Sequence, residues 1–394
     1  MRNLAILLLF LLFFGCTYNE KIDEDVKSNS TISYNFSYKN ITVEEFDEQL
    51  KNKDFFLVDV HTPEQEHING TDLFIPYDQI IQRISELPQD KDAKIVLYCR
   101  SGRMSEIAGE KLAEKGYTNI YNVLGGKKTY DNLTQELKKE ERELIYDQTA
   151  PEEGINLSIK WADIGPKIIQ SGALDYDIFE ELMKNNGHSL TDDQRQILLY
   201  GSDQYITINR TNNLFLLDVM WAFGLVNNNS ILYNGAISNS QTNKNNFAST
   251  GGWPLGKKPG GELLSSSNIL ILTQEQQKKV ETITSNVYRP CCNNPTSFPD
   301  CNHGMASLGL TQLMVYNNMS EDDIYRNLLY ANSYWFPRTY VDIGQYLKEQ
   351  GKDWDSVDAK EILGFDYSSY SGYASIRSRL QNSSIVSSDA SCGA

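Results

Sequence analysis

The strongest constraint on the fold is a stretch of about residues 41–132 in which short apolar segments alternate with segments of helical periodicity. Apolar runs of strand length are separated by stretches whose apolar residues recur at spacings of three and four. The predicted strands are residues 55–60, 94–98 and 120–124, and the predicted helices are residues 42–50, 76–87 and 105–115. Strands joined by helices of this length form right-handed βαβ units. We therefore predict an α/β domain with a parallel sheet covered by helices on both faces.

A cysteine, Cys99, directly follows the second predicted strand, at the sheet edge where ligands bind in open α/β folds. The residues after it form a turn that leads into a helix: Arg100, Ser101, Gly102, Arg103, Met104 and Ser105. Backbone N–H groups in such a turn, together with the helix dipole, favour negative charge on a sulfur atom. The two arginines add positive charge, and Gly102 suits a backbone conformation that a side chain would hinder. The pattern predicts Cys99 as a thiolate nucleophile.

These segments resemble the rhodanese family over residues 41 to about 131. The resemblance rests on residues 57–60, 62–64, 67–70, 98–105 and 116–126. It implies that Cys99 attacks a sulfane donor such as thiosulfate, carries the sulfur as a persulfide and passes it to cyanide or a thiol, without a cofactor. It also implies that residues 100–105 bind the substrate, and that Asp59 and His67 support the loops around the active turn.

Two other interpretations of the Cys99 loop are open. Cysteine phosphatases have a similar loop, but they need an arginine six positions after the cysteine, where this chain has Ser105. The loop also resembles the shorter rhodanese type, which favours a sulfur-sized substrate over a phosphate-sized one. The second alternative is a rhodanese fold without activity that serves only for binding. Both Cys99 and the glycine-containing turn argue against that alternative.

The first residues are predicted to be an export signal. Arg2 precedes an apolar run at residues 4–14, which ends at Gly15 and Cys16. The run is shorter than the roughly 20 residues that a membrane-spanning helix needs. Its layout is typical of secretory signals, and it resembles a prokaryotic lipoprotein signal in which Cys16 becomes lipidated. We expect a signal peptide at residues 1–15, a flexible tether at 16–40, and an exported protein anchored to the membrane on its extracytoplasmic side.

The remaining sequence predicts a second, mainly helical domain. The formal net charge of −16 excludes a general nucleic-acid binder, since a phosphate backbone repels such a chain. Mixed charges at residues 133–150 predict a solvated connecting helix. Capping boxes at Thr191 and Thr273 predict helix starts within residues 151–382. An apolar stretch at 214–225 predicts a core helix, residues 247–261 a long loop, and residues 383–394 a tail.

A second group of reactive side chains lies in a loop rich in Pro and Asn: Cys291, Cys292, Cys301 and His303. Thiolates and an imidazole this close in sequence suit Zn²⁺ or Cu⁺. The second interpretation is disulfides, which persist in an exported chain. The three cysteines and Cys392 are an even number and could all be paired. The third interpretation is a redox or sulfur-accepting dithiol. This loop and residues 335–337 resemble a prokaryotic helical family without an assigned function.

Two classes of function follow from these patterns. The first is an extracytoplasmic sulfurtransferase that takes sulfane sulfur from a small donor and gives it to a thiol or cyanide. The second is a membrane-anchored binding protein that handles metals or thiols and in which the rhodanese module is accessory.

Overall fold

The computed structural model describes residues 38–382. Several predicted features lie outside the described residues: the signal peptide with Cys16 after it, most of the tether, and the tail with Cys392. The chain divides into two compact units, with the boundary between Leu133 and Thr134. Among the described residues, none of the helices combines the length and hydropathy needed to cross a bilayer.

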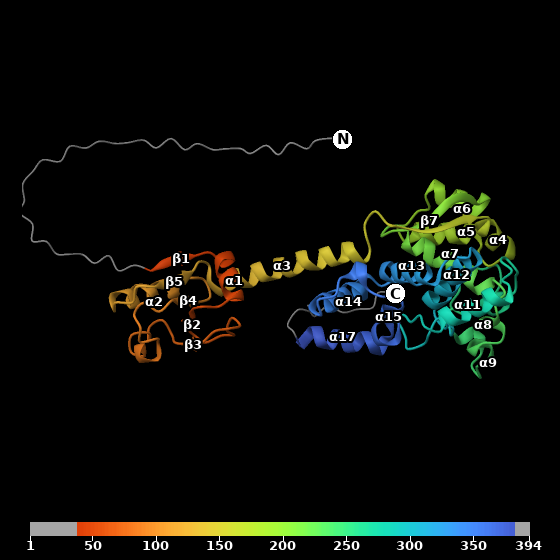
Figure 1. Ribbon diagram of the computed structural model, residues 1–394. Helices are drawn as coiled ribbons and strands as arrows, with labels where there is room; N and C mark the ends of the chain where they lie inside the picture. Colours follow the sequence, from red (N-terminus) through yellow and green to blue (C-terminus); the bar gives the residue numbers. More distant parts are fainter. Residues whose placement is uncertain (1–37, 383–394) are drawn as a thin grey trace, which may run out of the picture. The chain divides into compact units, whose positions relative to one another are not determined.

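The first unit is built on a five-stranded, entirely parallel sheet in the order β1-β5-β4-β2-β3 (Figure 1). Its elements are β1 (Lys39–Ile41), α1 (Val43–Lys51), β2 (Phe56–Asp59), β3 (Leu73–Phe74), a short 3₁₀ helix (Ile84–Glu86), β4 (Ile95–Tyr98), α2 (Arg103–Glu114), β5 (Ile120–Val123) and the first part of α3 (Gly126–Thr149). In the centre of the sheet, Leu57 of β2 is paired with Val96 of β4, and Leu97 of β4 is paired with Asn122 of β5. This sheet confirms the predicted α/β class.

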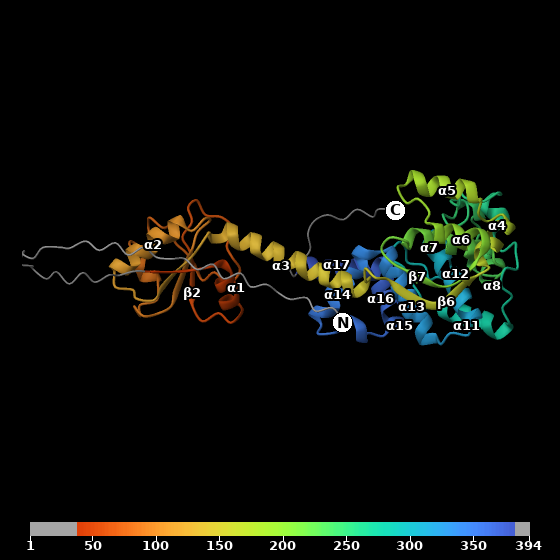
Figure 2. The same cartoon turned by 90° about the horizontal axis from the view of Figure 1, so that it is seen from above.

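Helices cover both faces of this sheet, as predicted (Figure 2). Because successive side chains of a strand point to opposite faces, the side chains of β4 contribute to two hydrophobic cores, one on each face of the sheet. On one face, Ile95 and Leu97 pack with Ala108 and Leu112 of α2. On the other face, Val96 packs with residues of α1 and α3. The strands are therefore buried on both sides, which accounts for their continuous apolar sequences.

Three details of the first unit differ from the sequence-based expectation. The predicted helix at residues 76–87 is wrong: this segment forms turns and the short 3₁₀ helix Ile84–Glu86. Ile80 is fully buried in the core beside α2, so the turns bury the same apolar side chains that suggested a helix. Pro88 also holds Leu87 in an extended conformation and ends the segment. The edge strand β3 was not predicted, and β1 begins at Lys39, inside the predicted tether.

The second unit is mainly helical, as predicted. Its elements are β6 (Ile155–Ala162), α4 (Ile164–Ser171), α5 (Tyr176–Asn185), α6 (Asp192–Tyr200), β7 (Ser202–Ile208), α7 (Asn213–Val226), α8 (Ser230–Tyr233), α9 (Ala236–Asn239), α10 (Gly260–Leu263), α11 (Gln274–Thr284), α12 (Asn302–Tyr316), α13 (Glu321–Trp335), α14 (Pro337–Glu349), α15 (Ala359–Ile362), α16 (Phe365–Ser368) and α17 (Tyr370–Asn382), with two further 3₁₀ turns (Lys244–Asn246 and Trp354–Ser356). The antiparallel pair of β6 and β7 was not predicted.

The core of the second unit is the contact between α7 and α12, which lie side by side in both views (Figures 1 and 2). Nearly all residues of both helices are buried. Gly224 and Gly309 allow this close contact, because a Cβ atom on either would collide with a carbonyl oxygen of the other helix. The predicted core helix at 214–225 is thus confirmed, and the capping boxes at Thr191 and Thr273 are present.

The predicted connecting helix is part of α3, which starts at Gly126 and continues to Thr149. Its later part is not simply solvated: Ile145 and Thr149 are buried, and both lie against Gly344 of α14. Ion pairs join Arg142 to Asp342 and Glu141 to Lys348. The mixed charges at residues 136–143 predicted a solvated helix, and two of these charged residues instead pair with α14.

Candidate active site

Cys99 lies at the carboxyl end of β4, the central strand of the first unit's parallel sheet. Its side chain is nearly inaccessible, with 1% exposure. The chain turns through residues 100–102 and enters α2 at Arg103. Gly102 is the N-cap of α2 and has a φ of 91°, a left-handed conformation that an L side chain strains. The predicted turn between strand and helix is therefore present at Cys99.

An amide of the turn and a hydroxyl of α2 lie close to the sulfur atom of Cys99. The Gly102 N–H donates to Cys99 Sγ over 3.2 Å, and the Ser105 hydroxyl lies 3.5 Å from the same atom. The Ser105 Oγ is closer to the Gly102 carbonyl oxygen, at 2.9 Å. A hydroxyl proton that bonds this carbonyl holds the turn in place, so that the Gly102 amide points at the sulfur. The arrangement favours negative charge on Cys99.

The other predicted loop residues differ in their exposure to solvent. Arg100, Ser101 and Arg103 are exposed, whereas Met104 is half-buried and packs on the core beside α2. The two arginine side chains make no ion pair within residues 38–382. Exposed guanidinium groups next to a buried sulfur attract small anions toward the loop without occupying it.

A second turn, at Gly125 and Gly126, is hydrogen-bonded to the backbone of the Cys99 loop. This contact was not predicted from the sequence. The amides of Lys127 and Lys128 donate to the carbonyl oxygens of Cys99 and Arg100 over 2.8 and 3.0 Å. A Cβ atom on Gly126 would lie 2.2 Å from the Cys99 carbonyl oxygen, so only glycine allows this approach. The adjacent glycines at 125 and 126 were the signal that could have revealed this contact.

Asp59 and His67 form a hydrogen-bonded pair beside the sheet. The Asp59 carboxylate is fully buried at the end of β2, and its Oδ2 lies 2.8 Å from His67 Nδ1. Its other oxygen accepts from the His61 amide over 2.9 Å. The hydrogen bond to Asp59 raises the pKa of His67 although burial opposes it, and a weaker contact to Glu64 acts in the same direction. The pair thus ties the loop after β2 to the sheet.

The second group of predicted residues comes together in the helical unit. All four described cysteines are free thiols, and Cys291 Sγ lies 3.3 Å from Cys301 Sγ. Cys291, Cys301 and His303 offer ligand atoms within 4.8 Å of one another. Cys292 belongs to a second set, with Asp300 and Cys301. The predicted metal ligands are therefore close, but they form two overlapping sets rather than one.

The sequence analysis missed Arg289, which is fully buried among these thiols. Hydrogen bonds from Cys291 and Cys292 hold the pKa of the Cys301 thiol well below its usual range, and His303 and the Arg289 charge add to this shift. Hydrogen bonds with Cys292 and Cys301 raise the pKa of the Cys291 thiol. The cluster therefore favours one anionic sulfur, at Cys301, and a protonated neighbour.

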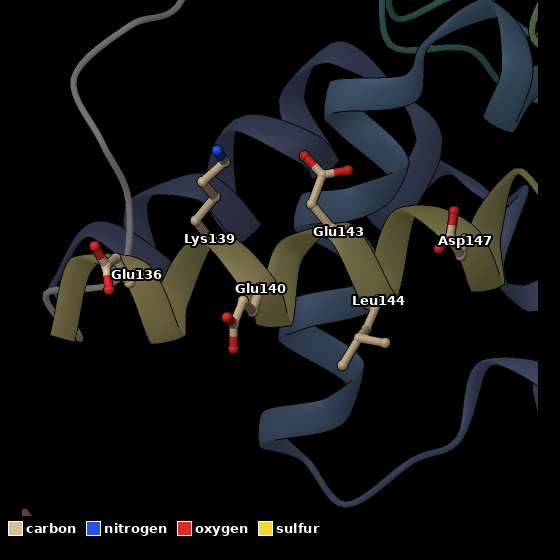
Figure 3. Close-up of a pocket in the computed structure, with 6 residues that line it drawn as sticks. All are labelled: Glu136, Lys139, Glu140, Glu143, Leu144 and Asp147. Carbon is tan, nitrogen blue, oxygen red and sulfur yellow. The ribbon is translucent and has the colours of Figure 1, made fainter. Parts of the chain in front are cut away.

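A surface hollow runs along one side of α3, and no cysteine or histidine lines it (Figure 3). Its lining residues are Glu136, Lys139, Glu140, Glu143, Leu144 and Asp147. Acidic side chains outnumber the single lysine, so the hollow repels an anionic sulfur donor. It also contains no nucleophile, and it is not a candidate for the sulfur chemistry.

The known proteins that resemble this chain match it within the first unit. The model of the rhodanese-like domain matches residues 42–133. Thiosulfate sulfurtransferase PspE of Escherichia coli is 40% identical over 71 residues, which are 17% of this chain and 67% of that protein. Thiosulfate sulfurtransferase GlpE of Coxiella burnetii is 32% identical over 97 residues, 24% of this chain and 87% of that protein. A solved rhodanese-related protein from Thermoplasma volcanium is 23% identical, covers 24% of this chain and 93% of its own, and has a TM-score of 0.22.

Proposed function

The chain belongs to the rhodanese family through residues 42–133, which form a sulfurtransferase domain, and from this premise we propose that Cys99 is its sulfur carrier. Cys99 takes a sulfane sulfur from a small donor, holds it as a persulfide and gives it to a thiol or to cyanide. The reaction requires no cofactor, because the protein supplies both the nucleophile and the groups that stabilise its charge.

The first step is attack by the Cys99 thiolate on the outer sulfur of a donor such as thiosulfate. A new S–S bond forms at Cys99, the S–S bond of the donor breaks, and sulfite leaves with the electron pair. In the second step a cyanide or thiolate acceptor attacks the outer sulfur of the persulfide. Cys99 then leaves as a thiolate, so the same amide that stabilised the attacking sulfur also stabilises the leaving one.

One observation carries this proposal: the Gly102 N–H points at the buried Cys99 sulfur over 3.2 Å. Charge on a sulfur with 1% exposure has little help from water, so donors of the protein must replace it. The Gly102 amide does so at the start of α2, where the helix dipole acts in the same direction. Arg100 and Arg103 are exposed around the loop and suit an anionic donor.

We further propose that the protein works outside the cytoplasm, anchored to the membrane by a lipid on Cys16. The support is the sequence of residues 1–16, in which a short apolar run follows Arg2 and ends at Gly15 and Cys16. Fractionation and mass spectrometry of the N-terminal peptide test this part. A lipid on Cys16 supports it, and an unprocessed N-terminus overturns it.

Thiocyanate formation from thiosulfate and cyanide tests the sulfur-transfer step. The full chain is expected to form thiocyanate, and Cys99→Ser is expected to lose this activity while its thermal unfolding stays unchanged. Cys292→Ser is the matched control, because it removes a thiol outside residues 42–133 and should keep the activity. Equal turnover in the wild type and in Cys99→Ser would overturn Cys99 as the sulfur carrier, and a wild type that forms no thiocyanate above background would favour a binding module.

A further inference from the structure

The loop before α12 and the first turn of this helix bring three thiols, an imidazole and a buried arginine together in the helical unit. Cys301 is the N-cap of α12, and its sulfur atom accepts the N–H of Gly304 over 3.4 Å. The helix that it caps is 15 residues long and almost entirely buried against α7. Cys301 is therefore fixed at a rigid position, unlike a cysteine in a mobile loop.

Arg289 provides the second donor to the same sulfur. Its Nε lies 3.0 Å from Cys301 Sγ, while its other nitrogens donate to the carbonyl oxygens of Asn294 and Phe298 and to Asp300 Oδ1. The guanidinium is fully buried, and each of its three nitrogens donates at least one hydrogen bond. A Cβ atom on Gly304 would lie 2.6 Å from its Cζ, so glycine is needed for the arginine to reach the helix start.

The surroundings of Cys301 repeat the main feature of the Cys99 site. In both places the amide of a glycine three residues later donates to the cysteine sulfur at the start of a helix, from Gly102 to Cys99 and from Gly304 to Cys301. The two sites are in separate units with different folds. A partial positive charge at the helix start and a full charge on Arg289 both stabilise a negative sulfur at Cys301.

A second thiol stands next to Cys301. Cys291 Sγ lies 3.3 Å from Cys301 Sγ, and Cys291 is exposed to solvent. Cys301 is half-buried, so the pair lies at the edge of the helical unit's core rather than inside it. The pair therefore combines a stabilised nucleophile with a neighbouring thiol that can attack whatever the nucleophile has bound.

We propose that Cys301 is a second sulfur-carrying cysteine, which accepts sulfane sulfur from a persulfide, and that Cys291 releases this sulfur as sulfide. The inference rests on the proposed function for the class of its substrate. The Cys301 thiolate attacks the outer sulfur of a persulfide R–S–SH, a new S–S bond forms, and R–S⁻ leaves with the electron pair. Cys301 then carries the –S–SH group.

In the next step the Cys291 thiol attacks Cys301 Sγ and passes its proton to the departing sulfide. A Cys291–Cys301 disulfide forms, and the sulfide leaves with the electrons of the broken bond. The sulfane sulfur is thereby reduced to sulfide, while the two thiols are oxidised to the disulfide. A further turnover needs an external dithiol, which reduces the disulfide and is itself oxidised to a disulfide.

The charges around the cluster favour sulfur chemistry over a metal ion. The cation that Cys301 already faces at 3.0 Å is the Arg289 guanidinium, which opposes a second cation beside it. Asp300, a member of the second ligand set, is engaged by the same arginine over 2.6 Å. Sulfur transfer, in contrast, begins from the Cys301 thiolate and brings no second cation to the site, so both donors of Cys301 can stay in place.

The test uses the full-length Cys99→Ser variant, reduced and freed of reductant, with glutathione persulfide as the donor. Rapid alkylation followed by peptide mass spectrometry locates the sulfur, and sulfide is measured in solution. We expect stoichiometric sulfide release with formation of the Cys291–Cys301 disulfide. In Cys99→Ser/Cys291→Ser, sulfide falls to the background rate and an extra sulfur atom stays on Cys301. In Cys99→Ser/Cys301→Ser, neither product forms.

Cys292→Ser in the same background is the matched control, because it removes a thiol of the same cluster that is outside the proposed pair. It should retain both products. A zinc or copper ion that is bound stoichiometrically to the purified protein and protects the thiols from alkylation would overturn the proposal. So would extra sulfur on Cys291 or Cys292 with Cys301 unmodified. Circular dichroism of each variant shows that lost products do not reflect unfolding.

This design separates the inference from the proposed function. Because Cys99 is absent, a failure of thiosulfate turnover at Cys99 leaves the outcome at Cys301 unaffected. Conversely, the wild-type chain can form thiocyanate from thiosulfate even when glutathione persulfide leaves Cys301 unmodified, and that result would overturn the second carrier alone.

Discussion

Replacing Gly102 by alanine perturbs the amide that stabilises the sulfur of Cys99. Gly102 has a φ of 91°, and a Cβ atom there would lie 3.1 Å from the Gly125 nitrogen. The left-handed conformation costs an alanine about 1–2 kcal/mol. The contact with Gly125 is also too tight to accept a methyl group, so the turn must shift by a few tenths of an ångström. The Gly102 N–H then loses its alignment with Cys99 Sγ.

The effect on activity follows from the hydrogen bond that is lost. A hydrogen bond to a charged group contributes about 1.5–3 kcal/mol. Because about 1.4 kcal/mol corresponds to a tenfold change in rate, we expect kcat/KM for thiosulfate to fall about ten- to a hundredfold. The same amide stabilises the Cys99 thiolate that attacks the donor and the Cys99 thiolate that leaves in the second step, so its loss affects both steps of the reaction.

Gly116→Ala is the matched control for this experiment. Gly116 also has a left-handed φ, of 84°, but a Cβ atom there would meet nothing within 4 Å. It follows α2 at the end far from Cys99, so alanine lowers stability by a similar 1–2 kcal/mol without moving the active turn. Thiocyanate formation and thermal unfolding are measured for both variants. An activity loss in Gly102→Ala no larger than in Gly116→Ala would refute the role of the amide.

Three further predictions use other groups of the chain. Removing the Ser105 hydroxyl, which bonds the Gly102 carbonyl oxygen, should lower kcat/KM about fivefold in Ser105→Ala, since such a bond contributes about 1 kcal/mol. Burial raises the pKa of Asp218 to about 7, so the stability of the protein falls as pH rises from the ordinary pKa of an aspartate toward 7. Asp218→Asn should therefore raise the melting temperature at alkaline pH but not at acidic pH. Asp59 raises the pKa of His67, so its contribution to stability is complete below the ordinary histidine pKa and is lost as pH rises through the raised value. Urea unfolding of His67→Gln should lack this pH dependence, and an unchanged profile would contradict it.

The fold of the first unit was readable from the sequence because its central strands are buried on both faces. Residues 95–98 are apolar throughout, and only a covered parallel sheet accommodates such a strand. The error at residues 76–87 shows the limit of the same reasoning. Ile80 and its apolar neighbours have helical spacing, but turns packed against the sheet bury them equally well. Periodicity reports which side chains are buried, and the backbone that buries them depends on the rest of the fold.

The second unit was less readable for two physical reasons. The strand β6 alternates buried and exposed residues, with Leu157, Ile159 and Trp161 inside, so its signal was present in the sequence and was overlooked. The role of Arg289 had no such signal. A charged residue is buried only where the fold supplies partners, and those of Arg289 come from a loop whose path depends on the packing of α12 against α7. The sequence predicted that the thiols are close together, but it did not predict that the Arg289 guanidinium is buried among them.

The most direct test of the account is to find the persulfide on Cys99. The full-length protein is mixed with thiosulfate, alkylated rapidly and digested, and the mass of the peptide that contains Cys99 is measured with and without cyanide. The account predicts one additional sulfur atom on Cys99, which cyanide removes as thiocyanate. Thiocyanate formation with a Cys99 peptide that never gains sulfur would contradict it.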